Sequence, residues 1–244
     1  MIDITGKSYK DIEKFVLDSI ENGNFREKSK IPSEIELAEK FNVSRMTANK
    51  ALSRLAEKNI ISRKRGIGSF VNPIRIERQI PLMQSFTETH SQPNIKVTSS
   101  FFNYKVENVS SFPFLKNTLF LDDEDLIHFF IRVRYLNKKA IAVSYNYVVA
   151  NIVRNLDIYC LNNSFYDYLE RTLGLELGYN DTVIEVVYPN DELRAYLNIQ
   201  KDQNQSLVLS THTSYLTNDK PFEYTKTYYL AEYYSFKYKC YRNI

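Results

Sequence analysis

The 244-residue chain has few of the residues from which disulfide frameworks and zinc sites are built. Its two cysteines, Cys160 and Cys240, are far apart in the sequence and have no partners at ligand-like spacing. This pattern argues against both kinds of site and favours a reducing compartment. The sequence therefore predicts a cytoplasmic protein with no metal and no cofactor.

Long apolar runs are also missing. Stretches such as Val148-Val149-Ala150 are far too short to cross a bilayer. Asp3, Lys7 and Lys10 precede any apolar stretch, so the beginning of the chain does not resemble a secretory signal. Hydrophobic residues make up 43% and charged residues 25%, as in soluble globular proteins. We expect no membrane partner.

Signatures of catalysis are scarce. His90, His128 and His212 are the only histidines, and their isolation favours structural or surface positions. The sequence has neither a glycine-rich phosphate loop nor a Gly-x-Ser-x-Gly elbow. The acidic stretch LDDEDL at 121–126 lacks the spacing of a calcium loop, which favours a solvated turn. No catalytic residue is predicted.

Positive charge is concentrated in the first third of the chain. Residues 1–75 contain 15 Lys and Arg against 10 Asp and Glu, whereas residues 76–244 contain 17 against 19. A local excess of this kind is expected where one part of a protein binds a polyanion. Most tyrosines and phenylalanines lie after residue 80, where alternating patterns replace helical ones.

The N-terminal part carries signals for two helices before a tight turn. Apolar residues recur at helical spacing before Gly23, which predicts a first helix: Ile12, Phe15, Val16 and Ile20. Ser33 precedes Glu36 by three residues, the spacing of a capping box at the start of a second helix. Asn42 and Val43 then form the turn.

Ser44 is placed to cap a third helix that ends near Asn59. Its apolar stripe is Ala48, Ala51, Leu52 and Leu55. Arg45, Thr47 and Asn49 cluster near its start, while Lys50 and Arg54 are expected to point further outward. Two helices joined by a tight turn, the second exposing polar residues, indicate a helix-turn-helix motif.

A basic hairpin follows the third helix. The stretch IISRKRGIGSFV predicts two short strands around Gly66 and Gly68, with Arg63, Lys64 and Arg65 at the bend. Such a hairpin beside a recognition helix can reach a groove or its phosphates. A charged outer face is more often simply solvated, but the hairpin and the charge asymmetry together favour DNA binding.

Residues 8 to 72 resemble the winged helix-turn-helix of the GntR family of bacterial transcription regulators. The resemblance rests on Pro-Ser-Glu, Val-Ser-Arg-Met-Thr and Gly-x-Gly-x-Phe-Val. It implies base contacts in the major groove, phosphate contacts from two serines, and a wing tip in the minor groove. The predicted DNA-binding residues are Ser33, Glu34, Ser44, Arg45, Thr47, Asn49, Lys50, Arg63, Lys64, Arg65, Gly66 and Gly68. Two positions depart from the family: Ile35 stands where many members have arginine or histidine, and Asn49 where many have arginine. Asparagine at that position favours adenine, whereas arginine favours guanine.

The stretch NPIRIERQIPLMQS at 72–85 has two prolines and no sustained period, so residues 73–85 are predicted as a linker. Beyond it, β-branched and aromatic segments are separated by turn residues such as Asn137-Lys138. Helical patterns occur at 164–173 and 190–198. The order predicts an antiparallel α+β domain over residues 86–244, following a winged helix-turn-helix domain over residues 1–72.

Arg132 and Arg134 are two residues apart in an otherwise apolar strand. Alternation places both on one face, with Ile131 and Val133 on the other. Two guanidinium groups on one face suit a phosphate or carboxylate. Structural salt bridges to Glu223 or another acid are an equally good interpretation of the sequence alone.

Residues 82 to 240 are similar to the UTRA effector-binding domain of the HutC branch of the GntR family, which resembles chorismate lyase in fold. The similarity rests on Arg-x-Arg, KKAIAVSYNYV, SFYDYLERTLG, LRAYLNI and KPFEYTKTYY. It implies a small effector, such as a sugar phosphate or an organic acid, bound by Phe86, Arg132, Arg134, Ser144, Ser164, Tyr166, Glu223 and Tyr229. Ser144 stands where sugar-phosphate responders often have glutamate, and Ala140 replaces a proline.

The resulting prediction is a homodimeric repressor that binds an inverted-repeat operator in double-stranded DNA and responds to a small anionic metabolite. It would catalyse no reaction. Two alternatives belong to other classes. One is an enzyme on the chorismate-lyase-like fold, and the other is an architectural DNA-binding protein whose second domain is indifferent to ligands.

Overall fold

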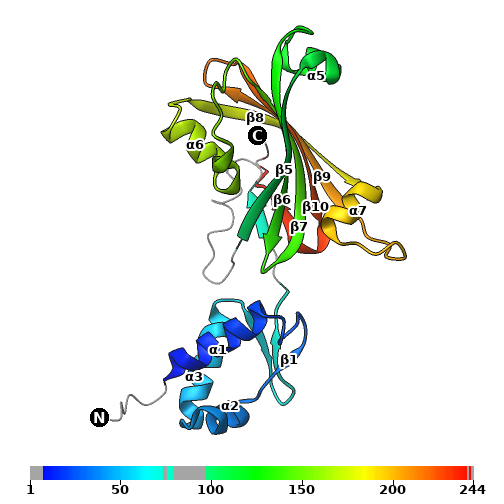
Figure 1. Cartoon of the computed structure of the whole chain (residues 1–244). Helices are drawn as coiled ribbons and strands as arrows, with labels where there is room; N and C mark the ends of the chain where they lie inside the picture. Colours follow the sequence, from blue (N-terminus) through cyan, green and yellow to red (C-terminus); the bar gives the residue numbers. More distant parts are fainter. Residues whose placement is uncertain (1–7, 74–75, 80–96, 241, 243–244) are drawn as a thin grey trace. The chain divides into compact units, whose positions relative to one another are not determined.

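The computed structural model describes residues 8–73, 76–79, 97–240 and 242. The chain divides into two compact units, residues 1–74 and residues 75–244 (Figure 1). The segment predicted as a linker contains a strand, β4 (Ile76–Gln79), which pairs within the second unit. Its four residues are too few to show an alternating pattern, so the sequence alone did not reveal it.

Three helices and a small sheet form the first unit. The helices are α1 (Tyr9–Glu21), α2 (Glu34–Phe41) and α3 (Arg45–Glu57). The strands β1 (Lys30–Ile31), β2 (Ile61–Lys64) and β3 (Gly68–Val71) pair antiparallel in the order β1-β3-β2. The predicted helices and wing strands are confirmed, and β1 is an additional strand.

Local capping explains where these helices begin. Ser8 with Asp11 and Ser33 with Glu36 form capping boxes, and the Ser44 side chain accepts a bond from the amide of Thr47. Asn42 ends α2 in the left-handed conformation, which asparagine adopts more easily than most residues. The apolar stripe predicted for α3 is fully buried and packs against Ile12, Val16 and Leu37.

The second unit contains a six-stranded antiparallel sheet in the order β5-β6-β7-β10-β9-β8. Its strands are β5 (Val97–Asn108), β6 (Leu126–Leu136), β7 (Lys139–Val149), β8 (Leu177–Val187), β9 (Leu207–Leu216) and β10 (Pro221–Leu230). A separate parallel pair joins β4 to β11 (Tyr234–Lys237). The predicted antiparallel α+β fold is confirmed.

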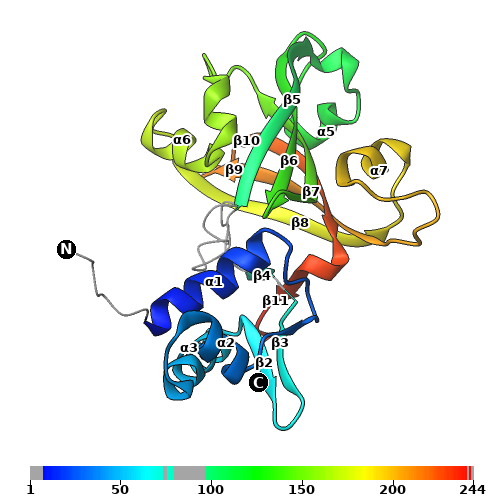
Figure 2. The same cartoon turned by 60° about the horizontal axis from the view of Figure 1, so that its bottom comes forward.

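Short helices cover this sheet on both sides. They are η1 (Val109–Ser111), α5 (Leu115–Leu119), η2 (Ile158–Asn162), α6 (Phe165–Arg171), α7 (Asp191–Leu197) and η3 (Ala231–Tyr233). Helices α6 and α7 lie on opposite sides of the sheet in both views (Figures 1 and 2). Phe165 of α6 packs against Phe130, whereas Phe114 beside α5 packs against Tyr147 on the other face. The site predicted around Arg132 lies on the α6 side.

His128 and the acidic stretch at 121–126, which were expected to be structural, contact neighbouring residues of the fold. The ring of His128 contacts the Tyr104 hydroxyl and the Val153 carbonyl, each at 2.9 Å. The acidic stretch 121–126 leads through a turn into β6, and Lys116 pairs with Asp123. His90 lies outside the described residues. Within the described ranges, no group of acidic, His and Cys side chains could hold a metal ion, and no helix is long and apolar enough to span a bilayer.

Candidate DNA-binding and effector-binding sites

The N-terminus of α3 presents polar side chains to the solvent. Arg45 has 69% of its side chain exposed, and Asn49 is exposed one helical turn further on. Thr47 is half-buried, its hydroxyl lies 2.9 Å from the Ser44 hydroxyl, and its amide donates to the same oxygen. The start of α3 is therefore held by Ser44, while Arg45 and Asn49 are available to a partner.

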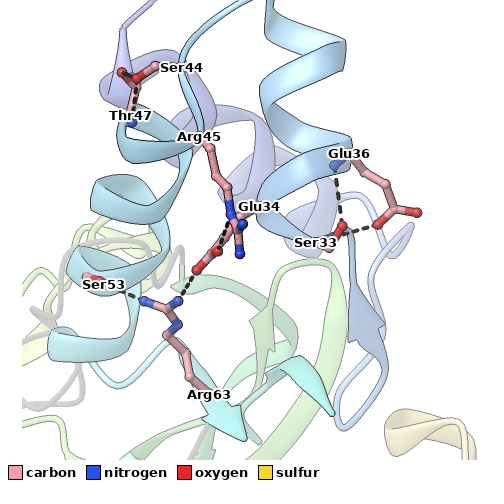
Figure 3. A network of polar contacts seen from close by, with 8 residues as sticks. All are labelled: Ser33, Glu34, Glu36, Ser44, Arg45, Thr47, Ser53 and Arg63. Atoms are coloured by element: carbon pink, nitrogen blue, oxygen red, sulfur yellow. Dashed lines mark hydrogen bonds and ion pairs between the residues drawn. The ribbon is translucent and has the colours of Figure 1, made fainter. Parts of the chain in front are cut away.

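Glu34 joins the first residues of α2 to both α3 and the wing (Figure 3). Its carboxylate accepts a hydrogen bond from Arg45 Nε at 3.3 Å and another from the Arg63 guanidinium. Arg63 also donates to the Ser53 hydroxyl of α3 at 2.7 Å. One carboxylate thus fixes two of the predicted DNA-binding arginines relative to each other.

This network changes the expected placement of Arg63. The sequence grouped Arg63 with Lys64 and Arg65 at the bend of the hairpin. In the structure, Arg63 is directed from β2 toward α2 and α3, and only a third of its side chain is exposed. The position of Arg63 in the hairpin sequence did not predict the direction of its side chain, because its partners are 10 and 29 residues away in the sequence.

The other predicted cations divide into two groups. Lys50 lies over the Tyr9 ring, 4.5 Å from its centre, and Arg54 donates to Glu13 at 2.6 Å, so both cations contact α1, although Lys50 remains exposed. Lys64 and Arg65 are exposed at the end of the wing. Gly68 has φ +132, a backbone conformation that residues with a Cβ rarely adopt, so glycine is favoured at that position.

Ser33 is engaged in capping. Its hydroxyl accepts from the Glu36 amide at 3.3 Å, and its own amide donates to the Glu36 carboxylate at 2.7 Å. The bonds from Ser33 hold the pKa of Glu36 below its usual value. Ser33 and Ser44 nevertheless remain exposed at the N-termini of α2 and α3, where backbone amides favour anions.

In the second unit, one face of the sheet carries a patch of polar side chains, here called the polar face. Pairing aligns Arg132 with Ser144 and Thr227, and Arg134 with Ala142 and Tyr229. Ser210 continues the Arg132 row, and the next rows add further polar residues of β7, β9 and β10: Asn146, His212, Ser214, Glu223 and Thr225. Most of these side chains are buried, so each needs a partner there.

Arg132 is 3% exposed and donates to the Asn163 carbonyl at 2.7 Å, but its Nε has no hydrogen-bond partner. Burial, with repulsion from Arg134, holds its pKa well below the usual value. Arg134 donates to the Ser99 hydroxyl at 3.1 Å. Its pKa falls to about 10, chiefly because burial removes water from the charge. Two positive charges are thus held side by side in a poorly hydrated place.

Glu223 is 2% exposed and accepts hydrogen bonds from the Tyr166 hydroxyl at 2.7 Å and from Ser214 at 3.1 Å. Burial raises its pKa, although these two bonds act in the opposite direction. Arg132 forms no ion pair with any acid of the described residues. The alternative of a salt bridge between Arg132 and Glu223 is therefore wrong.

The remaining predicted effector residues occupy the same part of the unit. Ser144 is buried beside Arg132 and accepts from Asn146 at 3.1 Å. Ser164 caps α6 by accepting from the Asp167 amide at 3.3 Å, two residues before Tyr166. Tyr229 is 1% exposed and packs on Tyr234, with ring centres 4.3 Å apart. Phe86 lies outside the described residues.

Several residues of the polar face were not predicted from the sequence. Successive side chains of a strand point to opposite faces, which places Ser210, His212 and Ser214 on one face, but residues 210–214 are all polar and the sequence does not show which face is buried. Burial, with repulsion from Arg78, lowers the pKa of His212 to about 4, which keeps its ring neutral near pH 7. The sequence did not predict a place for Arg78 on this face, because its strand lies within the segment that was predicted as a linker.

Comparison with known proteins agrees with both halves of this description. The model of the "Bacterial regulatory proteins, gntR family" matches residues 8–71, and the UTRA domain model matches residues 95–235. The chain is a GntR-family transcription regulator with a UTRA domain. This family binds DNA, its UTRA domains bind small-molecule effectors, and its members are regulators rather than enzymes. The enzyme alternative is therefore wrong.

Full-length relatives share this organisation. The transcriptional repressor NagR of Bacillus subtilis is 28% identical, with 93% of this chain and 92% of NagR covered. The mannosyl-D-glycerate system repressor MngR of Escherichia coli is 25% identical over 93% of each chain. The crystal structure of YydK from Bacillus subtilis is 26% identical, with a TM-score of 0.59 and coverage of 96% of this chain and 99% of YydK. PhnF from Mycobacterium smegmatis, at 19% identity and a TM-score of 0.69, covers 97% of this chain and 100% of its own and shares the fold.

Proposed function

We propose that this regulator is a cytoplasmic repressor that binds an inverted-repeat operator as a homodimer and changes its operator affinity when a small anion binds on the polar face. The observation that carries the effector assignment is Arg132, a buried cation whose Nε is unpaired and which has no acidic partner among the residues that the structure describes. A buried charge of this kind is strongly unfavourable unless an anion pairs with it. Two of the relatives are named as repressors, which supports the direction of regulation.

The anion is a sugar phosphate or an organic acid. Arg132 and Arg134 bind the negative group of the effector. Ser164 and Tyr166 form further hydrogen bonds with that group, and Glu223 accepts a hydrogen bond from the other end of the effector. Tyr229 and Ser144 line the same rows of the sheet. Ser144 offers a hydroxyl where a glutamate would accept two bonds, so fewer sugar hydroxyls can be satisfied there.

The effector can be found by thermal shift. The full chain is heated with sugar phosphates, amino-acid catabolites and organic acids, and ligands that raise Tm are then titrated against operator DNA. A ligand of the folded state at 100 times its Kd stabilises by about 2.7 kcal/mol. If only neutral compounds raise Tm, or if stabilising anions leave operator binding unchanged, the proposal is wrong.

On the operator, the start of α3 reads bases, and the wing contacts the backbone. Arg45, Thr47 and Asn49 enter the major groove. Lys50 lies beside them, and Ser33 and Ser44 approach phosphates. Lys64 and Arg65 contact DNA from the wing, whose tip at Gly66 and Gly68 enters the minor groove. Arg63 and Glu34 position these groups through the network described above.

Replacing Lys64 or Arg65 with alanine should weaken operator and random DNA alike. A phosphate contact carries no sequence information, and each one adds roughly 0.9 to the slope of log K against log salt. DNA-binding titrations at salt concentrations from about 50 mM to about 200 mM measure that slope. If either variant kept the slope of the parent and lost only operator binding, the residue would read sequence instead.

Glu34→Gln should raise affinity for random DNA a few-fold and lower the ratio of operator to random affinity. The change removes a negative charge near the phosphates and leaves Arg45 and Arg63 without the carboxylate that orders them. Fluorescence anisotropy on both DNAs measures the two affinities, with Glu57→Gln in the last turn of α3 as the charge-matched control. An unchanged ratio would mean that the network does not position Arg45.

We expect a dimer formed mainly through the second unit. A single winged helix contacts too few base pairs to specify a unique site in a genome. A dimer with two-fold symmetry requires an operator with the same symmetry. Edge strand β8 supports this arrangement, because Val183 and Val186 are 59% and 74% exposed on it. Light scattering at micromolar concentration and footprinting test both points. A monomer that protects one half-site would contradict the proposal, and equal protection of unrelated sequences would favour an architectural protein.

A further inference from the structure

The first unit leaves large apolar side chains exposed to solvent at three positions. Within the described residues 8–73, these are Ile35, Met46 and Ile67, with exposed fractions of 52%, 82% and 59%. The other large apolar side chains of this stretch are buried or half-buried, most of them in the core around α3. A single exposed apolar side chain is common in soluble proteins, but several on one functional surface indicate a partner.

All three side chains lie on the elements that contact DNA in the proposed function. Ile35 is the second residue of α2, and Met46 is the second residue of α3, so each follows its capping serine by two positions. Ile67 lies between Gly66 and Gly68 at the tip of the wing. The apolar groups of this unit that solvent reaches are thus found where a duplex would be bound.

An ion pair holds the starts of α2 and α3 together. Arg45 Nε lies 3.3 Å from the carboxylate of Glu34, and these two residues directly precede Met46 and Ile35 (Figure 3). Glu36, on the other side of Ile35, accepts a hydrogen bond from the amide of the capping serine at 2.7 Å. Both carboxylates beside Ile35 are therefore bonded within the protein, and an apolar side chain stands exposed between them.

Met46 is directed away from the core of the unit. The buried stripe of α3 consists of Ala48, Ala51, Leu52 and Leu55. With about 3.6 residues per turn, Met46 falls on the opposite side of the helix. Asn49 follows three residues later and shares that side. Met46 therefore neighbours a residue that is proposed to read a base edge.

Thymine is the base that offers an apolar partner in the major groove. It presents a C5 methyl group there, whereas the other groups that distinguish the base pairs donate or accept hydrogen bonds. We infer that Ile35 and Met46 each contact the C5 methyl group of a thymine in the operator half-site. They thereby add two A·T pairs to the bases that are read by hydrogen bonds. This inference rests on the proposed function, because it requires the starts of α2 and α3 to enter the major groove.

The test replaces thymine with deoxyuridine, which removes the methyl group and keeps the base pair. The full chain first selects its operator from random double-stranded DNA, and each thymine of one half-site is then replaced in turn. Fluorescence anisotropy measures the affinity for each duplex. The parent should lose about fourfold in affinity at two of these positions, the factor expected for one buried methyl-sized group.

Variants assign each methyl group to a side chain. Ile35→Ala and Met46→Ala should each abolish the loss at one of the two positions and leave the loss at the other. Ile67→Ala is the matched control, because Ile67 is similarly exposed but lies at the wing tip, and the minor groove presents no methyl group. Both losses should persist in that control. All three side chains are exposed, so these variants should fold as the parent does.

The outcomes separate this inference from the proposed function. If no thymine replacement weakens binding by the parent, or if both losses persist in Ile35→Ala and in Met46→Ala, the inference is wrong and operator binding stands. A loss that persists in only one of these variants removes that residue from the contact. If the random pool yields no preferred sequence, the proposed function itself fails.

Methyl NMR gives an independent measurement for Met46, one of three methionines in the chain. In protein labelled with ¹³C at the methionine methyl groups, the operator complex should show a nuclear Overhauser effect between Met46 and a thymine C5 methyl group. The effect should disappear when that thymine is replaced by deoxyuridine. A Met46 methyl resonance that keeps the chemical shift of the free protein in the complex would overturn its role.

Discussion

Arg134→Ala is expected to weaken effector binding about tenfold or more. The bonds between a charged donor and an anion contribute roughly 1.5–3 kcal/mol each, and 1.4 kcal/mol corresponds to a factor of ten. Arg134 is already held by Ser99 and keeps a pKa of about 10, so it is charged and positioned before the ligand arrives. Its loss removes attraction without removing a core side chain.

Effector titrations of operator binding measure this loss. Arg154→Ala is the matched control, since Arg154 is exposed and donates to the Asn151 carbonyl nearby. Arg134→Lys keeps the positive charge but lacks the planar guanidinium that can donate two parallel hydrogen bonds, so it should recover part of the affinity. If the Arg134→Ala variant required the same effector concentration as the parent, the anion would bind elsewhere.

Arg45→Ala and Asn49→Ala should each reduce discrimination between operator and random DNA by about 1–3 kcal/mol. Both side chains are exposed at the start of α3, and each can form two hydrogen bonds with one base edge. Arg45 must first leave Glu34, an exposed ion pair that contributes roughly 0–1 kcal/mol. Base contacts in the major groove can therefore replace it.

The two positions should also prefer different bases. Arginine pairs best with guanine and asparagine with adenine, so substituting single operator bases should reveal one partner for each residue. Arg26→Ala, an exposed loop position, controls for the loss of one positive charge. Equal losses on operator and random DNA for Asn49→Ala would show that it does not read a base.

Local signals in the sequence determined most of the fold. Capping residues and apolar spacing placed the three N-terminal helices, because a helix end is satisfied by residues within a few positions. Alternation placed Arg132 and Arg134 on one face, since the period of a strand is two. The basic hairpin and its two glycines determined the wing.

Only the tertiary structure decided which partners the charged groups have. Glu34 bonds to Arg63 across 29 residues, Tyr166 to Glu223 across 57, and Arg78 to Tyr229 across 151. Strand β4 exists because β11 pairs with it, and its own four residues carry no period. Helix caps and strand faces are local properties of the chain, whereas the partner of a buried charge is set by the packing of distant segments. That packing left Arg132 Nε unpaired within the described part of the chain and brought Arg78 into contact with Tyr229.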